Sequence, residues 1–485
     1  MDNKITSLQP QAVWKYFNAI CQVPRPSGHL DKITEYIMGV GRSLGLETIL
    51  DKAGNVIIRK PATPGMENRK PVILQGHMDM VPQANKSVNH NFETDPILPR
   101  IDGEWVSATE TTLGADNGIG ISSILAILES KEIQHGPIEA LFTNDEETGM
   151  YGAIGLEPGE LQGEILLNTD SEQDGELYMS CAGGVDVNVE FKYKEEAYTP
   201  VAGEIALKLT LGGLHGGHSG VDIHLGRANA NKLMFRFLKE AVCDYGARLS
   251  AVEGGSLRNA IPREAFAIVT IPGDNVEALW ELVADYQDMF REEYAGIEDR
   301  IRFYAEMTEL PETLIPEEIQ DDLINAIEGC QNGVINMLHD FPGTVESSSN
   351  LSIVKTSDEL IEVKILVRSS SESRKYAIYS SLESVFAMAG AKVEEANGYN
   401  GWQPNINSPV LNRVKTAYQE LFGTEPEVKV MHAGLECGII QGVYPEMDMI
   451  SIGPDIQFPH SPGERVNIAS VEKIWRLIVD VLEKI

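Results

Sequence analysis

The sequence predicts an α/β protein in which a helix-covered, mainly parallel mixed sheet is interrupted by an α+β domain with an internally duplicated antiparallel sheet. Three observations lead to this prediction: short continuous apolar runs in the first and last parts of the chain, alternating apolar and polar residues in the middle, and a strand–helix–strand pattern that occurs twice there. Runs that are apolar on both faces are typical of central strands covered by helices. We therefore expect one domain over residues 1–192 and 398–485, with the second domain inserted over residues 193–397.

The first part of the chain alternates between predicted helices and strands. A helix is expected after the turn at Pro26–Gly28, since apolar residues recur at helical spacing from Ile33 to Leu44. A hairpin is expected around Ala53–Asn55. The runs that predict central strands are Val72–Leu74, Ile138–Phe142 and Ile165–Leu167, and the helix between the first two carries Ile121, Ile124, Leu125 and Leu128.

The inserted region begins with a strand that is apolar on one face only, from Ile205 to Leu211, as in an antiparallel sheet with helices on one side. Residues 265–305 and 360–396 then share a strand–helix–strand pattern, which predicts an internal duplication. After Gly398 the α/β pattern returns, with a strand at 449–452 and a closing helix.

Composition limits the classes of partner. The 485-residue chain has 39 Lys and Arg against 73 Asp and Glu, a formal net charge of −34. Such a surface repels phosphate backbones and anionic lipid, so we expect neither a nucleic-acid nor a membrane partner. None of the five cysteines forms a C-x-x-C pair, the N-terminus lacks the apolar core of a secretory signal, and no apolar run approaches the ~20 residues of a membrane span. We expect a cytoplasmic protein.

Polar clusters follow the predicted strands of the first domain. Four such clusters contain His77 and Asp79, Glu146 and Glu147, Asp170 and Glu172, and His460, and a fifth, with Asp116, precedes the predicted helix that carries Ile121. Ligands of open α/β sheets bind at the carboxyl ends of the strands, and imidazole with carboxylate is the ligand set of catalytic zinc, cobalt or manganese. A single such cluster would be better explained by helix capping or by a solvated loop. Five clusters together favour a metal site.

The pair Glu146–Glu147 is the most informative of these clusters. Adjacent carboxylates in a loop can point in different directions, so that one binds a metal ion and the other serves as general base to an activated water. The alternative is an acidic loop that faces solvent.

Seven stretches of the chain resemble a known family. They are Gln75–Pro82, Thr112–Gly120, Asn168–Glu172, Leu214–Gly220, Leu257–Ala265, His432–Gly438 and Gly453–Pro462. These motifs are similar to those of the di-zinc metallopeptidases that include carboxypeptidase G, aminoacylase and carnosinase. The resemblance implies that the first domain is catalytic and that the inserted domain is a lid that binds substrate. One small departure from the family pattern is Asn144–Asp145, before the glutamate pair.

The resemblance implies two divalent metal ions, with Zn²⁺ expected and Co²⁺ or Mn²⁺ as alternatives. Asp116 would bridge the ions. The other ligands would be His77 and Asp170 for one ion, and Glu147 and His460 for the other. The family's bridging aspartate precedes a cis peptide bond, which here would be Asp116–Asn117.

The resemblance also implies roles for five further residues. Asp79 would orient the first histidine ligand, Glu146 would be the general base, and His218 would stabilise the oxyanion. Asn259 and Arg368 would bind the substrate, since a guanidinium recognises a carboxylate through two hydrogen bonds.

The implied function is hydrolysis of dipeptides, Xaa-His and broader unblocked dipeptides, by a metal-activated water with a glutamate base. The alternatives are an aminoacylase or tripeptidase of the same family, and a catalytically inactive binding protein, which the full set of ligands argues against. Small peptides are the expected partners, and formation of a homodimer stays open. Because His218 and Asn259 lie in the first predicted copy of the duplication and Arg368 in the second, we expect His218 to act in the site of its own chain.

Overall fold

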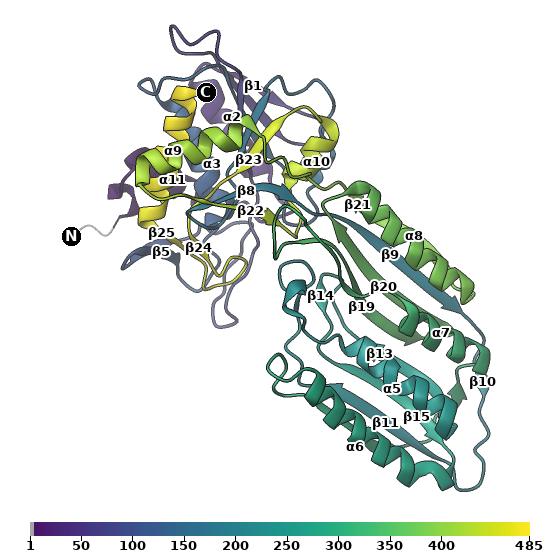
Figure 1. Ribbon diagram of the computed structural model, residues 1–485. Coiled ribbons are helices and arrows are strands. Elements are labelled where there is room, and N and C mark those ends of the chain that lie inside the picture. The colour runs from purple at the N-terminus through teal and green to yellow at the C-terminus, as the bar shows by residue number, and fades with distance from the viewer. Residues whose placement is uncertain (1–3) are drawn as a thin grey trace. The chain divides into compact units, whose positions relative to one another are not determined.

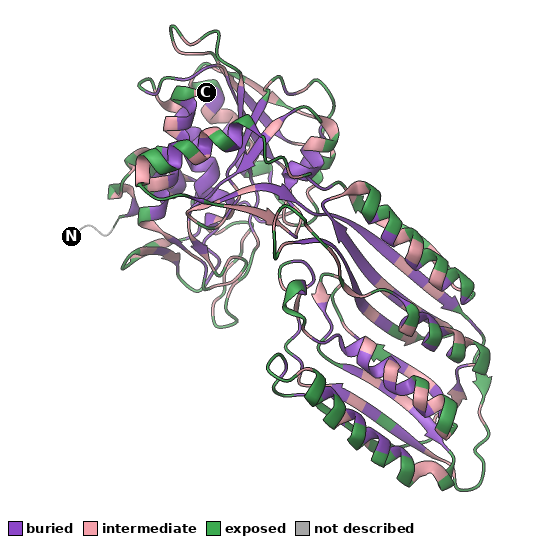
Figure 2. Ribbon diagram, viewed as in Figure 1, coloured by how far each residue is buried: buried purple, intermediate pink, exposed green. Residues whose placement is uncertain are grey.

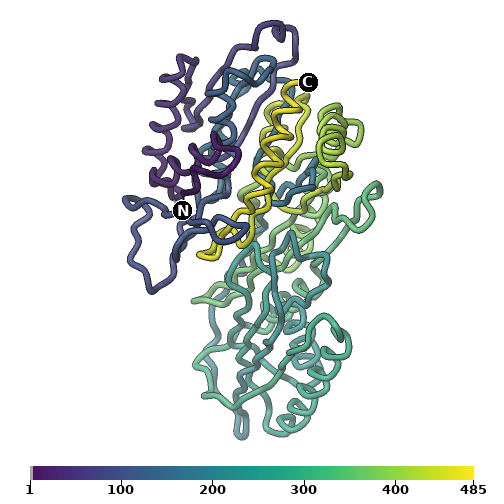
Figure 3. The backbone as a smooth tube through the Cα atoms, turned by 90° about the vertical axis from the view of Figure 1, so that its left-hand side faces the viewer, coloured from purple at the N-terminus to yellow at the C-terminus, as the bar shows by residue number. Residues whose placement is uncertain are grey.

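The structure is a computed structural model that describes residues 4–485. The chain forms two compact units. Unit 1 comprises the residues up to Cys181 together with Trp402–Val430 and Leu435–Ile485, and unit 2 comprises Ala182–Gly401 and Met431–Gly434. The first described residue, Lys4, and the C-terminal Ile485 both belong to unit 1, whose N-terminal part is purple and whose last helix is yellow in Figure 3.

Unit 2 begins earlier than residue 193, where the sequence places the domain boundary. The reason is β9 (Gly183–Lys192), which is hydrogen-bonded between β20 (Leu360–Ser369) and β21 (Lys392–Tyr399) of unit 2. The far boundary, after Gly401, lies close to the predicted residue 398.

Unit 1 is built around an eight-stranded sheet in the order β1-β2-β6-β3-β7-β23-β8-β22. Its strands are β1 (Glu47–Leu50), β2 (Val56–Lys60), β3 (Val72–His77), β6 (Ile138–Thr143), β7 (Ile165–Asn168), β8 (Glu176–Cys181), β22 (Glu427–Met431) and β23 (Asp448–Ser451). The central strands β6, β3, β7 and β23 run parallel, and antiparallel pairs flank them. Every residue of β3, β6 and β7 is buried, as the continuous apolar runs predict (Figure 2). The predicted fold class is confirmed.

The helices of unit 1 bury apolar faces against this sheet and one another. They are α1 (Gln11–Ile20), α2 (Asp31–Ser43), α3 (Ala115–Glu129), α4 (Tyr151–Ile154), α9 (Pro409–Phe422), α10 (Glu436–Val443) and α11 (Ile468–Lys484), with a 3₁₀ turn at Ile5–Ser7. From Asn117 to Leu128 every residue of α3 is buried, because this helix packs against β3 and α1. The side chain of Ser408 caps α9 by accepting a hydrogen bond from the Leu411 N–H.

A small four-stranded sheet holds the last functional loop of unit 1. It consists of β4 (Pro99–Asp102), β5 (Trp105–Ala108), β24 (Ile456–Gln457) and β25 (Arg465–Asn467), in the order β24-β25-β5-β4. Residues 458–464 form the loop of the β24-β25 hairpin, so the pairing of β25 with β5 fixes the base of this loop.

Unit 2 contains a nine-stranded antiparallel sheet in the order β16-β11-β15-β13-β19-β20-β9-β21, with β18 paired to β19. The remaining strands are β11 (Ile205–Gly212), β13 (Arg248–Gly254), β15 (Ala265–Ile271), β16 (Arg302–Thr308), β18 (Gly333–Met337) and β19 (Val345–Ser357). Four helices lie on one face of the sheet (Figure 1). They are α5 (Ala230–Tyr245), α6 (Val276–Glu293), α7 (Glu317–Gly329) and α8 (Glu372–Met388). The apolar core lies between these helices and the sheet.

The sheet of unit 2 consists of two halves with the same order of elements. The first half is β11-α5-β13-β15-α6-β16 and the second is β9-α7-β19-β20-α8-β21, each a βαββαβ unit. The halves meet where β13 pairs with β19, and the first half is inserted in the sequence between β9 and α7 of the second. The predicted duplication is confirmed and extends over six elements instead of three.

Two short ribbons and two 3₁₀ turns complete unit 2. The ribbons are β10 (Glu196–Ala197) with β17 (Thr313–Leu314), and β12 (Gly217–His218) with β14 (Ala260–Ile261); the turns are Ile223–Leu225 and Gly273–Asn275. Among residues 4–485, no helix combines the length and the apolar character that a membrane span requires.

Candidate metal centre

The side chains predicted to bind metal meet at one edge of the unit 1 sheet. His77 is the last residue of β3, Asp170 follows β7, and Glu147 lies in the loop after β6. Asp116 lies in the first turn of α3, and His460 lies in the loop of the β24-β25 hairpin. The carboxyl ends of parallel strands therefore collect these groups as the sequence predicts.

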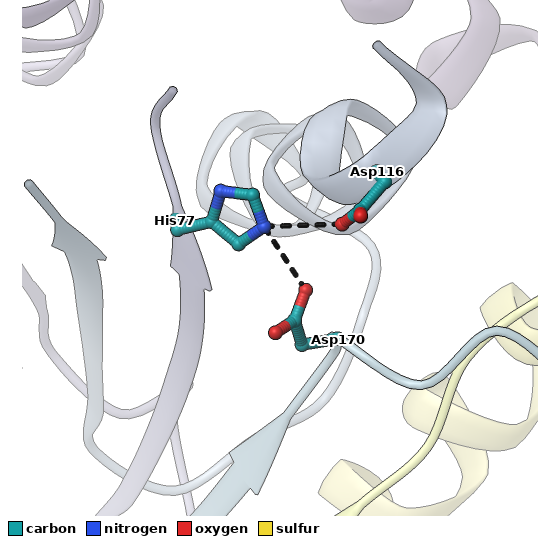
Figure 4. A group of neighbouring side chains, drawn as sticks. All are labelled: His77, Asp116 and Asp170. Carbon is teal, nitrogen blue, oxygen red and sulfur yellow. Dashed lines mark hydrogen bonds and ion pairs between the residues drawn. The ribbon is translucent and has the colours of Figure 1, made fainter. Parts of the chain in front are cut away.

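His77, Asp116 and Asp170 form the first ligand group. The Nε2 atom of His77 lies 3.0 Å from Asp116 Oδ1 and 3.1 Å from Asp170 Oδ1. Figure 4 shows both carboxylates turned toward this nitrogen, one from the start of α3 and the other from the end of β7.

Asp116, Glu147 and His460 form the second ligand group. The Nε2 atom of His460 lies 3.0 Å from Glu147 Oε2 and 3.3 Å from Asp116 Oδ2. Asp116 thus directs one oxygen to each group, which is the arrangement that a bridging carboxylate needs. A further set of close ligand atoms comes from His77, Glu146 and Glu147. The peptide bond Asp116–Asn117 is cis.

The electrostatics of both groups favour a bound cation. Hydrogen bonds to Asp116 and Glu147 raise the pKa of His460 to about 11. Burial would lower the pKa of His77, but Asp170 and Asp116 raise it well above its ordinary value. Both histidines therefore sit where positive charge is strongly stabilised, and a divalent ion bound to the neutral rings exploits the same potential.

The chemistry of the donor set fits a divalent ion such as Zn²⁺, Co²⁺ or Mn²⁺. The groups contain imidazole nitrogen and carboxylate oxygen. Burial raises the pKa of Asp170 to about 6, with Asp116 and Glu147 adding to the effect and His77 opposing it. The Glu147 Oε1 atom is buried and has no hydrogen-bond partner among the described residues. Crowded carboxylates and an unpartnered buried oxygen are what ligands look like when the ion itself is their partner.

Asp79 holds both the first histidine and the glutamate loop. Its Oδ1 lies 3.3 Å from His77 Nδ1, and its two oxygens accept hydrogen bonds from the backbone N–H groups of Glu146 (2.9 Å) and Glu147 (3.1 Å). Ser27 Oγ donates a further hydrogen bond to Oδ2 at 2.8 Å. Burial would raise the pKa of Asp79, but His77, the Ser27 hydroxyl and the Glu146 N–H together lower it to about 2, so its charge is kept. Asp79 therefore sets the spacing between ligand and candidate base.

Glu146 is half-buried, and the loss of solvent around its carboxyl raises its pKa well above the ordinary value; His77 opposes this effect, and Asp170, Glu436 and Glu147 add to it. A carboxylate with a raised pKa is a stronger base, which suits a group that takes a proton from water. The neighbouring Asp145, at the position that departs from the family pattern, accepts a hydrogen bond from the Gly28 N–H at 2.8 Å.

Two buried charged residues that sequence reasoning missed hold the Asp116 loop. The Glu464 carboxylate accepts hydrogen bonds from four successive N–H groups, those of residues 113–116, at 2.7–3.3 Å. The Arg25 guanidinium donates to the carbonyl groups of Met78 (3.0 Å), Asp79 (2.6 Å) and Gly114. Arg25 therefore joins the end of β3 to the Asp116 loop, and Glu464 joins the His460 loop to it.

Gly114 must be a glycine for this arrangement. Its φ of +69° lies in the left-handed region, and a Cβ atom would lie 2.6 Å from Arg25 Nη2.

Glu436, in the stretch His432–Gly438 that resembles the family, lies behind the proposed metal ligands. It is fully buried and accepts hydrogen bonds from Gln75 Nε2 and Thr143 Oγ1, both at 2.6 Å. Burial and the nearby Asp170 and Asp79 raise its pKa to about 7, although Thr143 and His77 oppose this.

The remaining predicted residues belong to unit 2. His218 lies on β12, and the neighbouring Ser219 N–H donates a hydrogen bond to the Asn259 carbonyl at 2.8 Å. Arg368, on β20, donates from Nη1 to Tyr399 Oη (3.0 Å) and from Nε to Ser219 Oγ (3.4 Å). Within unit 2 the three residues are therefore neighbours. Arg368 is buried, with Tyr399 and the Ser219 side chain against it.

Comparison with known proteins identifies the family. Residues 73–484 match the family described as Peptidase family M20/M25/M40. The chain is 47% identical to the cytosol non-specific dipeptidase of Escherichia coli (strain K12), over 100% of this chain and 99% of that protein. The crystal structure of aminoacylhistidine dipeptidase from Vibrio alginolyticus superposes with a TM-score of 0.92 at 47% identity and covers 100% of this chain and 98% of that one.

A more distant structure shares the fold only. Aminopeptidase PepT from Bacillus cereus superposes with a TM-score of 0.57 at 16% identity, with 98% of each chain covered. The family predicted from the sequence motifs is confirmed by the match over most of the chain and by the full-length relatives: this chain belongs to peptidase family M20/M25/M40.

Proposed function

We propose that this chain is a metal-dependent dipeptidase that hydrolyses unblocked dipeptides, Xaa-His among them. The observation that carries the proposal is Asp116, which directs one carboxylate oxygen to each of two histidine-containing ligand groups. The relatives named above, a non-specific dipeptidase and an aminoacylhistidine dipeptidase, support this substrate class.

We propose two divalent ions, with Asp116 as their bridge. His77 and Asp170 would complete the shell of one ion, and Glu147 and His460 would complete that of the other. Zn²⁺ is the expected metal, and Co²⁺ or Mn²⁺ would suit the same nitrogen and oxygen donors. When bound, two such ions lower the pKa of a water molecule and polarise the carbonyl of the scissile peptide bond.

In this proposal Glu146 moves the protons of the reaction. Its carboxylate accepts a proton from the attacking water and returns it to the leaving amine. Asp79 holds Glu146 and Glu147 by their backbone N–H groups and keeps the His77 ring oriented. A hydrolysis of this kind needs no covalent intermediate with the chain.

Unit 2 supplies the contacts to the substrate in this proposal. His218 donates a hydrogen bond to the oxygen that becomes negative in the tetrahedral intermediate, Arg368 binds the carboxylate of the dipeptide, and Asn259 is a second polar contact. Within residues 4–485, the hydrogen bonds of the Arg368 guanidinium come from Nη1 and Nε, so Nη2 can donate to a ligand.

A substrate panel tests the function. The metal-loaded protein is assayed with Xaa-His and other dipeptides, tripeptides, and N-acetyl amino acids. Cleavage of the dipeptides, lost with a chelator and regained with Zn²⁺, Co²⁺ or Mn²⁺, is the expected result. A preference for N-acetyl amino acids or tripeptides would shift the assignment to the alternative classes, and metal binding without hydrolysis of any of these would leave a binding protein.

A mixing experiment tests whether His218 serves its own chain. The variants Glu146→Gln and His218→Ala are each expected to be inactive, and they are mixed under conditions that allow subunit exchange. We expect no recovery, because both halves of the duplicated sheet lie in one chain. Recovery in the mixture would show that sites are shared between chains.

A further inference from the structure

The ring of His218 is held by its own loop. Its Nδ1 atom accepts two backbone hydrogen bonds, from the Gly220 N–H at 3.1 Å and from the Val221 N–H at 3.0 Å. A backbone N–H is always a donor, so the nitrogen that receives it must offer a lone pair. A proton on Nδ1 would point at two other protons.

The loop that presents these N–H groups is itself fixed. The His218 N–H donates to Asp222 Oδ2 at 2.8 Å, and the Asp222 N–H donates to the His218 carbonyl at 3.1 Å. Gly220 passes so close to the His432 carbonyl that a Cβ atom would lie 2.1 Å from its oxygen. The turn around the imidazole therefore has little room to rearrange.

We infer that this turn locks His218 in the neutral tautomer that carries its proton on Nε2, so that the residue acts as a hydrogen-bond donor and not as an imidazolium or a proton carrier. The inference deepens the proposed function and rests on it for the catalytic meaning. The tautomer itself follows from contacts within unit 2 alone.

The charges around the ring agree with this assignment. Burial and the positive charge of Arg368 lower the pKa of His218 to about 4, and Asp222 opposes them. The groups that face the ring are Asp222 from its own loop, Arg368 from β20 and His432 from the segment Met431–Gly434. Burial lowers the pKa of His432 to about 3, so this neighbour adds no charge near neutral pH.

The chemical consequence concerns the tetrahedral intermediate. A neutral Nε2–H stabilises a developing oxyanion through a fixed dipole and gives up no proton to it. In the proposed reaction, Glu146 is therefore the group that carries the transferred protons. A locked tautomer also means that the donor is already oriented before the substrate binds, without reorganisation during the reaction.

Nitrogen NMR of the full-length protein tests the tautomer directly. The protein is labelled with ¹⁵N-histidine, long-range ¹H–¹⁵N correlations are recorded from about pH 5 to about pH 8, the range in which an ordinary histidine changes charge, and His218 is assigned by the signals lost in His218→Gln. We expect an unprotonated Nδ1 and a protonated Nε2 throughout. A protonated Nδ1, or an imidazolium that titrates in this range, would overturn the inference whatever the activity.

A pair of variants tests the lock itself. Val221 is exposed, and Val221→Pro removes one of the two N–H donors, whereas the control Val221→Ala keeps it. We expect Val221→Pro to raise the pKa of His218, to admit the Nδ1–H tautomer, and to lower kcat about tenfold with a smaller change in KM, a fraction of the ~10²–10³-fold cost of losing an oxyanion donor outright. An unchanged tautomer and pKa in folded Val221→Pro would refute the lock.

The wild-type spectrum decides the inference even if Val221→Pro does not fold. If the tautomer is as inferred but His218→Ala hydrolyses dipeptides at the wild-type rate, the lock stands and the proposed role of His218 in catalysis fails. The two failures are therefore distinguishable.

Discussion

His77 in unit 1 and His218 in unit 2 are surrounded in opposite ways. The His77 ring has carboxylates on both sides, with Nδ1 3.3 Å from Asp79 and Nε2 within 3.1 Å of Asp116 and Asp170. The His218 ring has two N–H groups on Nδ1 and lies near the positive charge of Arg368. The first environment raises the pKa of its histidine, and the second lowers it to about 4.

The difference shows how local structure assigns a role to the same side chain. The strand ends of the parallel sheet bring carboxylates from different parts of the chain around His77. Because Nδ1 of His77 faces Asp79, the lone pair of its Nε2 is available to a cation. The tight turn after His218 points two N–H groups at Nδ1 of this histidine. Because Nδ1 accepts them, the proton of the ring is on Nε2, which can then donate. In our proposal one unit therefore supplies a metal ligand and the other a hydrogen-bond donor. The predictions below test this contrast.

The largest effect is expected at the glutamate pair. Glu146→Gln should lower kcat about 10²–10⁴-fold, the usual cost of removing a general base, while the metal content stays unchanged. Glu147→Gln should instead weaken metal binding, since Glu147 contacts His460 in the second ligand group. Steady-state kinetics and metal analysis of both variants make the comparison. Wild-type turnover by Glu146→Gln would end the assignment of the base.

A second prediction concerns how the carboxylate-rich site is assembled. Glu464→Gln replaces one acceptor oxygen by an amide that faces N–H groups, so the loop of Asp116 and the loop of His460 should separate. Metal affinity should fall about 10–100-fold, as is typical for residues that orient ligands. The measurement is stepwise metal binding by titration calorimetry.

Glu139→Gln is the matched control for this variant. Glu139 is also buried and also accepts two backbone N–H bonds, from Gln162 and Gly163 at 2.7 Å each, but it lies near the other end of β6. It should lose stability and keep its metal affinity. Equal metal binding by Glu464→Gln and the wild type would show that Glu464 only stabilises the fold.

The third prediction concerns Arg368, the positive charge near His218. Arg368→Lys should raise KM for dipeptides about tenfold, the factor that a loss of ~1.4 kcal/mol in binding gives, because an ammonium cannot reproduce the planar fork. Dipeptide amides, which lack the carboxylate, should be poor substrates for both proteins to a similar degree. Arg374→Lys, on the same unit, is the control. A loss in kcat alone would contradict carboxylate binding.

The smallest effect is expected for the pH dependence of stability. The pKa of buried His432 is about 3 in the folded protein and near 6.5 when unfolded, so between these values the unfolded state binds the extra proton. Stability is therefore lost as the pH falls through this window. His432→Gln should flatten this part of the pH dependence of the free energy of unfolding in urea. Identical slopes for wild type and His432→Gln would contradict the assignment.

Residues that follow a strand in the sequence could be predicted as part of the site. The sequence indicates His77, Glu147 and Asp170 because each of them comes at or just after the end of an apolar run that predicts a strand. Arg25 and Glu464 were not, since their partners lie 53 or more positions away and depend on tertiary structure. The available signals were a charged residue between two prolines at Arg25 and the Pro-Gly turn before Glu464.

The position of β9 was also beyond the sequence pattern. Its residues read as the end of the first domain, because the strands that pair with it, β20 and β21, begin only at Leu360 and Lys392. Local periodicity indicates a strand but not the sheet to which it belongs.

The nested order of the two halves of unit 2 has a consequence for synthesis on the ribosome. β9 is made before the whole first half, which can form its own strand pairs as soon as Thr308 has emerged, since β11 pairs with both β15 and β16. Domains fold as units during synthesis, so we expect the first half to form before β20 and β21, the strands that pair with β9, have been synthesised. The sheet of unit 2 is then completed from the end that holds β16 and β11 toward the other end, where β21 pairs with β9 only after translation has passed Tyr399.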